Sequence, residues 1–526
     1  MAPFLLLAAA LAAAAPADAP PGSVAGRLTV LNDNGAWSWF MDERAVVDRG
    51  KLIVGSVRAV KTFQTGKDDP DWGNVEVAAL DLKTGEVARS VLHRHFEQDD
   101  HDNPAFLVRP DGRYLAVYSK HSVERKLYVR VSAPGDPMTW GPATEVTTPG
   151  NDHAPFGGDN ITYSNLYRMA DGRVYNFFRG FSHDPNFMTS DDLGQTWDYG
   201  GRLLRGRDGY SPYLKYASDG KDTVHFIATE DHPRSYDTSV YHGTLRGGVI
   251  RGSDGTEVGP LSRSTDTKVA VWHLTRVFQG DADNVAWVND IELDRCGRPY
   301  LAFSVQKDGR GLRPGRGGMD HRYYYARWDG SAWRCSPMAY AGTRLYPGED
   351  DYTGLVSLDP NDPGVAYFST NADPSTGVPL VSAADGCRHH ELFRATSRDG
   401  GSTWRYDPIT ADSPADNLRP IVPRWADPGG STLLVWMRGG YANNHGAWST
   451  AVVTTVLPSP PRPVRPAGGR LPGGTVASPA QRGARSGSGL AGRLHAAHRV
   501  RTWRCTMMPA KLSPIRWIVG CAATSG

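Results

Sequence analysis

The sequence has few of the features that mark helical, membrane-spanning or disulfide-rich proteins. Apolar residues rarely recur with the period of an amphipathic helix. No stretch reaches the roughly 18 apolar residues that a membrane span needs. Cysteine accounts for only 5 of 526 residues, which excludes a disulfide-dense scaffold. The 58 basic and 56 acidic residues nearly cancel and form no basic helix or RNA-binding signature, so we expect no nucleic-acid partner and no membrane partner.

Glycine (59), proline (38), tryptophan (15) and tyrosine (22) are abundant instead, which is typical of many short strands joined by turns. Composition divides the chain into four parts. Residues 1–19 hold a short apolar segment that ends in Ala-x-Ala options at Ala17 or Ala19, which predicts a signal peptide and secretion; the alternative is a disordered Ala-rich start. Residues 20–26 form a linker, 27–457 a uniform body, and 458–526 a tail whose Pro, Arg, Gly, Ala and Ser content predicts disorder.

The body repeats a hairpin in which an apolar strand, a tight turn and an aromatic strand follow one another. The turns are centred on Asp111-Gly112, Asp171-Gly172, Asp219-Gly220 and, as a variant, Cys296-Gly297. Asp-Gly suits the positive φ angles of such turns. The spacing of the glycines matches one four-stranded blade per repeat.

A second repeated element is the Asp-box, Ser-x-Asp-x-Gly-x-Thr-Trp. It is complete from Ser190 to Trp197 and from Ser397 to Trp404, and degenerate copies end at Trp140 and Trp333. We expect its residues to stabilise turns and to pack between blades, without a catalytic role. The sequence therefore predicts an all-β fold, a β-propeller most consistent with seven blades at residues 27–457.

Polar residues that suit proton transfer gather where these hairpins begin and end. His101 and His121 flank the first Asp-Gly hairpin, whereas Tyr163 and Arg179 flank the next. These positions predict that all four converge on one mouth of the propeller. An arginine fork can neutralise a uronate carboxylate. A histidine or tyrosine can then take the proton next to that carboxylate while its partner protonates the leaving oxygen. The alternative is that each residue serves only in a hydrogen-bond network at the rim.

The segments Trp37-Ser-Trp-Phe40, His101-Asp-Asn-Pro-Ala105, Tyr163-Ser-Asn165, Phe178-Arg179 and Asn417-Leu-Arg-Pro-Ile421 resemble those of the BNR-repeat polysaccharide lyases. That group includes ulvan lyases and L-rhamnose-α-1,4-D-glucuronate lyases on seven-bladed propellers. The resemblance implies a lyase that cleaves a uronate-containing polysaccharide by β-elimination. It implies that His101, His121 and Tyr163 are the catalytic acid and base groups and that Arg179 neutralises the carboxylate.

The same resemblance implies a further tyrosine from the next blade, for which Tyr236 and Tyr241 both stay open as candidates. The expected substrate-binding residues are Asn103, Asn165, Tyr236, Tyr241 and Arg419. No cofactor is expected for the chemistry, and we expect a monomer. A structural calcium or zinc ion fits the family, with the acidic runs at Asp99-Asp100 and Glu349-Asp351 as calcium candidates.

The three body cysteines leave two alternatives. One pair is bridged, or Cys387 joins His389 and His390 as soft ligands for zinc.

Two other classes of function compete with the lyase. Asp-boxes also mark sialidases, but no Phe/Tyr-Arg-Ile-Pro motif of that class is present near the start. A non-catalytic carbohydrate-binding propeller would use the same aromatic rim to stack on sugars. It would not need two histidines, a tyrosine and an arginine to converge.

Overall fold

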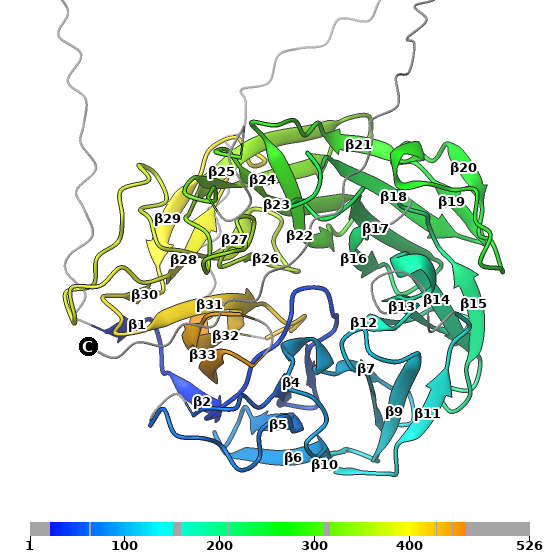
Figure 1. The fold of residues 1–526 in the computed structure, drawn as a ribbon, viewed down its shortest axis with the longest axis horizontal. Helices are drawn as coiled ribbons and strands as arrows, with labels where there is room; N and C mark the ends of the chain where they lie inside the picture. Colours follow the sequence, from blue (N-terminus) through cyan, green and yellow to red (C-terminus); the bar gives the residue numbers. More distant parts are fainter. Residues whose placement is uncertain are drawn as a thin grey trace, which may run out of the picture. The chain divides into compact units, whose positions relative to one another are not determined.

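The computed structural model describes residues 22–62, 65–150, 159–207, 211–309, 316–427, 429–443 and 446–458. The predicted signal peptide and nearly all of the predicted tail lie outside these residues. The described residues form seven antiparallel sheets arranged as the blades of a β-propeller (Figure 1), as predicted. No helix in the described ranges is long and apolar enough to cross a membrane.

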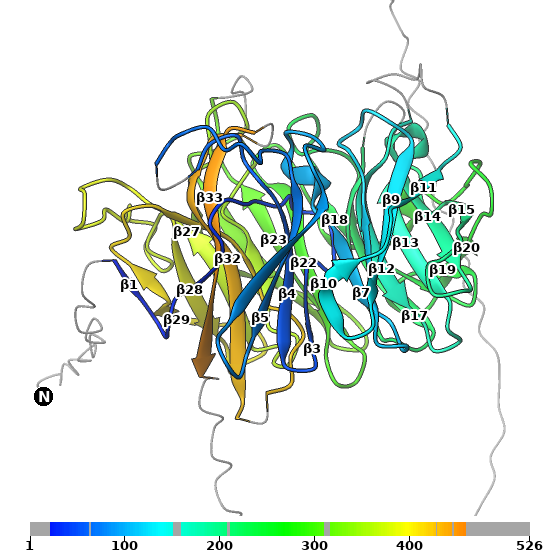
Figure 2. The ribbon, with the colours of Figure 1, turned by 90° about the horizontal axis from the view of Figure 1, so that it is seen from below.

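In each blade the strands follow one another outward from the central channel (Figure 1), and in the side view most of them run from one face of the ring towards the other (Figure 2). Blade 1 contains β3 (Ala45–Asp48), β4 (Lys51–Val57), β5 (Val75–Asp81) and β6 (Val87–His93). Blade 2 contains β7 (Ala105–Val108), β8 (Tyr114–Tyr118), β9 (Lys126–Ala133) and β10 (Asp136–Trp140), and β11 (Thr144–Thr147) pairs with β9. Blade 3 contains β12 (Thr162–Arg168), β13 (Val174–Arg179), β14 (Pro185–Ser190) and β15 (Asp198–Arg202).

Blade 4 is the largest sheet. It contains β16 (Tyr213–Ser218), β17 (Thr223–Thr229), β18 (Val240–Arg246), β19 (Val249–Arg251), β20 (Glu257–Pro260) and β21 (Thr275–Phe278). Blade 5 contains β22 (Val285–Leu293), β23 (Pro299–Gln306), β24 (His321–Trp328) and β25 (Trp333–Gly342). Blade 6 contains β26 (Val356–Leu358), β27 (Val365–Thr370), β28 (Glu391–Thr396) and β29 (Arg405–Pro408).

Blade 7 joins the two ends of the described chain. It contains β31 (Asp416–Ile421), β32 (Ser431–Tyr441), β33 (Trp448–Pro458) and, as its outermost strand, β2 (Thr29–Asn32). A separate two-stranded sheet pairs β1 (Ser23–Val24) with β30 (Thr410–Ala411). Because β2 pairs with β33, strands from both ends of the described chain share one blade and the ring of blades is closed.

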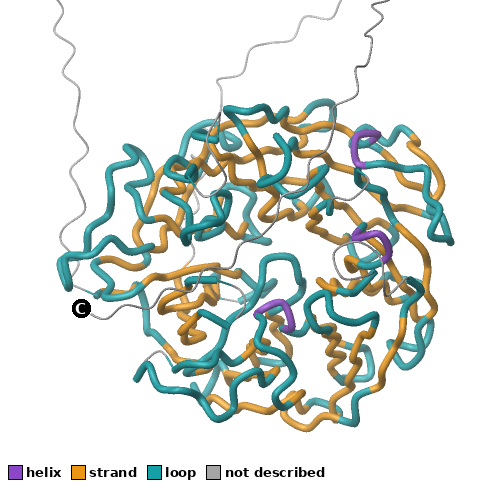
Figure 3. Tube along the Cα trace, in the orientation of Figure 1, coloured by secondary structure: helices purple, strands orange, loops and turns teal. Residues whose placement is uncertain are grey.

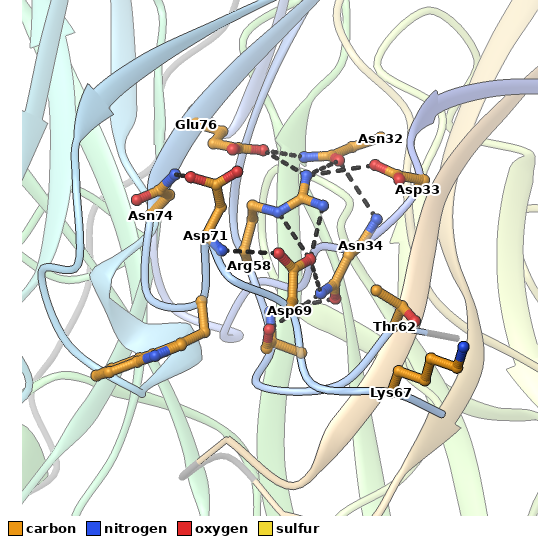
Figure 4. A network of polar contacts seen from close by, with 12 residues as sticks. Asn32, Asp33, Asn34, Arg58, Thr62, Lys67, Asp69, Asp71, Asn74 and Glu76 are labelled. Carbon is orange, nitrogen blue, oxygen red and sulfur yellow. Dashed lines mark hydrogen bonds and ion pairs between the residues drawn. The ribbon is translucent and has the colours of Figure 1, made fainter. Parts of the chain in front are cut away.

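A buried ion network reinforces this closure (Figure 4). The Arg58 guanidinium lies 2.7 Å from Asp69 Oδ2 and 3.2 Å from Glu76 Oε2, both in blade 1. It also donates to Oδ1 of Asn32, at the end of β2, over 3.1 Å. Arg58 is 9% exposed, so this network ties the closing strand to blade 1 away from solvent.

The predicted turns are present. The four predicted hairpin turns connect the first and second strands of blades 2 to 5, and their glycines have φ between 65° and 94°. In each complete Asp-box the threonine hydroxyl donates to the aspartate, as between Thr196 and Asp192 over 2.6 Å. Trp404 of the second box contacts Tyr325 of the neighbouring blade, with ring centroids 5.2 Å apart. The Asp-box therefore acts in turn formation and in packing between blades.

The cores lie between adjacent blades. Leu115 and Leu127 of blade 2, for example, pack with Leu166 and Phe178 of blade 3 in one buried cluster. The helical content is small, as Figure 3 shows, and consists of single 3₁₀ turns such as Asp100–Asp102. That turn immediately precedes β7 and positions the first residues of the site.

Candidate active site

The residues of the candidate site lie at the ends of inner hairpins in blades 2, 3 and 4. His101 belongs to the 3₁₀ turn before β7, and His121 follows the end of β8. Tyr163 lies at the start of β12, and Arg179 ends β13. In an up-down hairpin the start of the first strand and the end of the second lie at the same edge, so these side chains converge. The structure brings all four together.

Asp99 bridges the two histidines. Its Oδ1 lies 2.6 Å from His101 Nδ1, and its Oδ2 lies 2.7 Å from His121 Nδ1. The same carboxylate accepts the His101 backbone N–H and so caps the short helical turn. The two imidazole rings stack with centroids 3.7 Å apart and planes 7° apart. One buried carboxylate therefore fixes the orientation and the tautomer of both rings.

Neighbouring charges shift the pKa values of the two histidines in opposite directions. Burial disfavours the charged form of His101, yet the carboxylates of Asp99 and Asp100 raise its pKa to about 9. For His121, burial, the positive charge of His101 and Arg179 lower the pKa to about 4. The pKa of Asp99 lies well below its usual range because both histidines outweigh its burial. At neutral pH the pair thus holds one imidazolium and one neutral imidazole, the pattern of an acid and a base.

Tyr163 connects this pair to Arg179. Its hydroxyl lies 3.0 Å from His101 Nε2, and the Arg179 guanidinium lies over its ring, 4.7 Å from the centroid. Burial, together with Tyr213, raises the pKa of Tyr163 well above its usual value, although Arg179 opposes this. The residue has a φ of 67°, next to a register shift between β12 and β13. Such strain in a non-glycine residue is concentrated at functional sites.

Among the described residues, Arg179 has hydroxyl and imidazole neighbours but no acid partner. Its Nη2 lies 3.1 Å from Ser122 Oγ and 3.4 Å from His121 Nε2, and its Nη1 donates to the Tyr213 hydroxyl over 3.4 Å. Within the described ranges no carboxylate lies at ion-pair distance from Arg179, and its Nε is buried without a hydrogen-bond partner. A small pocket that opens to solvent is lined by Tyr163, Arg179 and Tyr213. A partly buried guanidinium without a counter-ion is suited to bind an anionic group.

Tyr213, at the start of β16, is the residue that sequence reasoning missed. It opens the Asp219-Gly220 hairpin in the way that Tyr163 opens the preceding one, and this equivalence was a usable signal. The two predicted alternatives lie elsewhere. Tyr241 is 7% exposed within a core cluster of blades 3 and 4, and Tyr236 is 37% exposed beneath the guanidinium of Arg207.

The predicted substrate-binding residues Asn103 and Asn165 are buried, and their side chains form hydrogen bonds with backbone groups. Asn103 Oδ1 accepts the Ser38 N–H, and Asn165 donates to the carbonyls of Tyr163 and Phe177. Both asparagines are at most 2% exposed, so they shape the backbone of the site.

Arg419 is also withdrawn from solvent. It is 1% exposed and its Nη1 lies 2.8 Å from Asp100 Oδ2. The Tyr441 hydroxyl donates to the same oxygen over 2.5 Å. Asp100 in turn lies 3.0 Å from His101 Nδ1. Arg419 therefore supports His101 through Asp100.

Three clusters in the described residues have the donor atoms for a metal ion. They are Asp99 with His101 and His121, Asp385 with Cys387 and His389, and His232 with Glu349 and Asp351. In the first, both Nδ1 atoms already face the Asp99 carboxylate. In the third, Nδ1 of His232 accepts the Arg234 N–H, which leaves a proton on Nε2 and no lone pair for a metal. Only the second cluster includes a thiol.

Cys296, Cys335 and Cys387 are all free, so the alternative of a bridged body pair was wrong.

Comparison with solved structures identifies the architecture. An ulvan lyase of polysaccharide lyase family PL25, bound to -[GlcA(1-4)Rha3S]-, aligns with a TM-score of 0.56 at 17% identity over 82% of this chain and 96% of that chain. The polysaccharide lyase Uly1 aligns with a TM-score of 0.50 at 12% identity over 83% of this chain and 100% of that chain. No curated protein matches the sequence. The chain is thus a seven-bladed β-propeller with the fold of these lyases.

A narrower assignment comes from the sequence family. The family model described as BNR repeat-containing family member matches residues 69–340, and the chain belongs to this family. The matched segment extends from blade 1 to blade 5 and contains His101, His121, Tyr163 and Arg179.

Proposed function

We propose that this protein is a secreted polysaccharide lyase that cleaves the bond to a uronic acid by β-elimination and leaves a 4,5-unsaturated uronate. The observation that carries the proposal is the partly buried Arg179, which has no acid partner in the described chain and lies 3.4 Å from the neutral His121, which in turn stacks on the protonated His101. A glycan carboxylate supplies the missing counter-ion. Binding of that carboxylate to Arg179 acidifies the adjacent C5–H.

The hydrogen bonds support the following proton transfers. His121 Nδ1 is held by Asp99, so its lone pair is on Nε2, the atom that lies 3.4 Å from Arg179. His121 Nε2 takes the C5 proton, the C5–H electrons form the C4=C5 double bond, and the C4–O4 bond breaks. Tyr163 gives its hydroxyl proton to O4 and is reprotonated by His101 Nε2. His101 is thus the proton reserve and Tyr163 the acid that contacts the substrate.

The substrate class follows from the same site and from the relatives. One relative of the same fold binds a glucuronate–rhamnose-3-sulfate oligosaccharide. This supports ulvan as the first glycan to test here and a rhamnose–glucuronate polymer without sulfate as the second. Residues 1–19 are proposed to direct secretion, which would bring the enzyme to such polymers.

The decisive experiment follows ultraviolet absorbance during incubation with each glycan, since the conjugated product absorbs where the substrate does not. A rise that is lost in Arg179→Ala and retained in Arg173→Ala supports the lyase. Arg173 is a matched control because it lies near the other end of the same hairpin and pairs with exposed Asp191. Release of reducing ends without an absorbance rise would instead make the protein a hydrolase.

A further inference from the structure

The connection between β27 and β28 forms a side hairpin on blade 6. Val381 pairs with Arg388 in an antiparallel bridge, and Ser382 N–H donates to the Cys387 carbonyl over 2.8 Å. Gly386 has a φ of 73°, which permits the tight turn at the tip. Asp385, Cys387 and His389 are spaced two residues apart along the chain, and the turn brings their side chains together at the tip of the hairpin.

These three side chains present a carboxylate, a thiol and an imidazole within 4.8 Å of one another. Asp385 Oδ2 lies 2.8 Å from His389 Nε2. Cys387 Sγ lies 3.9 Å from the Asp385 carbonyl oxygen. Cys387 is solvent-exposed and free, so its sulfur is accessible to an ion. Carboxylate, thiolate and imidazole together are a donor set that favours zinc over calcium or magnesium.

The orientation of His389 is set by a second blade. Its Nδ1 lies 3.4 Å from Oδ1 of Asp416, the first residue of β31 in blade 7. Asp416 is itself held, because the same oxygen accepts the His390 N–H over 2.9 Å. A proton on Nδ1 that faces this carboxylate leaves the lone pair on Nε2, directed at Asp385. Histidine ligands of zinc are commonly oriented by a carboxylate in this way.

We propose that Asp385, Cys387 and His389 bind a zinc ion, with water as the fourth ligand, and that Asp416 is a positioning residue for His389. When the ion binds, the Cys387 thiol releases its proton to solvent and the thiolate becomes a ligand. The ion links the side hairpin of blade 6 through His389 to the inner strand of blade 7. Of the residues that the sequence had indicated, His390 is not a ligand: its Nδ1 faces Asp416 at 3.6 Å, and Asp385 takes its place.

Cobalt(II) substitution tests the proposal, because only a coordinated thiolate gives a charge-transfer band in the near ultraviolet. The full-length protein is dialysed against a chelator and titrated with CoCl₂. We expect this band to saturate at one equivalent, to be displaced by Zn²⁺ and to be absent in Cys387→Ser. Asp416→Asn should weaken the affinity for Co²⁺ by roughly 10- to 100-fold while leaving the band position unchanged.

Cys296→Ser is the matched control. Cys296 is also exposed and free, and its N–H donates to Asp294 over 2.8 Å just as the Cys387 N–H donates to Asp385 over 2.8 Å. Cys296 belongs to none of the three donor clusters found in the described residues, so its substitution should not change the band. Absence of the band in the unaltered protein, or its survival in Cys387→Ser, would overturn the proposal. Neither outcome depends on lyase activity, so this test and that of the proposed function fail independently.

Discussion

His101 and His121 lie face to face, 3.7 Å apart, on opposite oxygens of one aspartate, and their pKa values move in opposite directions. The carboxylates of Asp99 and Asp100 stabilise the protonated form of His101. Because a second positive charge is unfavourable at this distance, the charged His101 keeps His121 neutral. The stack therefore converts two chemically identical side chains into an acid and a base.

A bell-shaped pH profile should follow. His121 must be neutral, so kcat/KM is lost as the pH falls through about 4. His101 must be charged, so activity is lost as the pH rises through about 9. The two limbs are properties of the coupled pair. Initial rates of unsaturated-uronate formation, measured over a pH range that extends beyond both limbs, test this prediction. An acidic limb at the ordinary histidine value near 6.5 would contradict the assignment, and Asp99→Asn should narrow the profile.

Tyr163→Phe should lower kcat by roughly 10²- to 10⁴-fold, because the proton donor to the leaving oxygen is removed. Its thermal unfolding should change little, since the ring and its contact with Arg179 are retained. Tyr167→Phe is the matched control: it lies on the same strand and its hydroxyl donates to the Tyr216 carbonyl over 3.0 Å. That control should cost about 1 kcal/mol of stability without affecting kcat. Near-native turnover by Tyr163→Phe would remove it from the mechanism.

Tyr213→Phe tests the residue that the structure adds to the site. Its hydroxyl accepts from Arg179 Nη1, so its removal should let the guanidinium shift and lower kcat/KM by roughly 10-fold. Tyr216→Phe, three residues along the same strand, should have no such effect, because among the described residues Arg179 donates to the hydroxyls of Tyr213 and Ser122 and not to that of Tyr216, whose ring stacks on Phe177. Equal losses in both variants would indicate a general effect on β16.

Arg58→Ala should destabilise the propeller by about 3 kcal/mol or more, because the acids that it neutralises, Asp69 and Glu76, stay buried without a counter-ion. Lys61→Ala removes an exposed pair with Asp68 and should cost less than about 1 kcal/mol. Urea unfolding measures both. If Arg58→Ala unfolds at the same midpoint as the unaltered protein, the network in Figure 4 does not stabilise closure.

The sequence predicted the repeating elements because each depends on local chemistry. Asp-Gly turns and Asp-boxes place their hydrogen bonds within a few residues, as between Asp192 and Thr196, and so leave a signature that can be recognised without the fold. The number of blades followed from their spacing. Convergence of His101, His121, Tyr163 and Arg179 followed from their equivalent places in adjacent hairpins.

What escaped prediction depends on contacts between distant segments. Arg419 matched a binding motif, yet it is buried because Asp100, which precedes it by 319 residues, takes its guanidinium. Tyr236 and Tyr241 were the candidates that the sequence left open, whereas the structure places Tyr213 next to Arg179, and this contact joins residues 34 positions apart in different blades. No pattern in the chain indicates that one carboxylate, Asp99, bridges two histidines.

The placement of β2 in the last blade has a consequence for the order of assembly. Thr450 in β33 donates to the carbonyl of Gly35, 415 residues earlier in the chain. A ribosome must therefore complete almost the whole propeller before the first strand finds its partner. Until β33 is made, β2 remains an unpaired strand, and its free backbone groups can pair with other nascent chains. Moving residues 22–35 to follow residue 458 would put the closing strand directly after its partner. Such a circularly permuted chain should refold faster and aggregate less than the natural order.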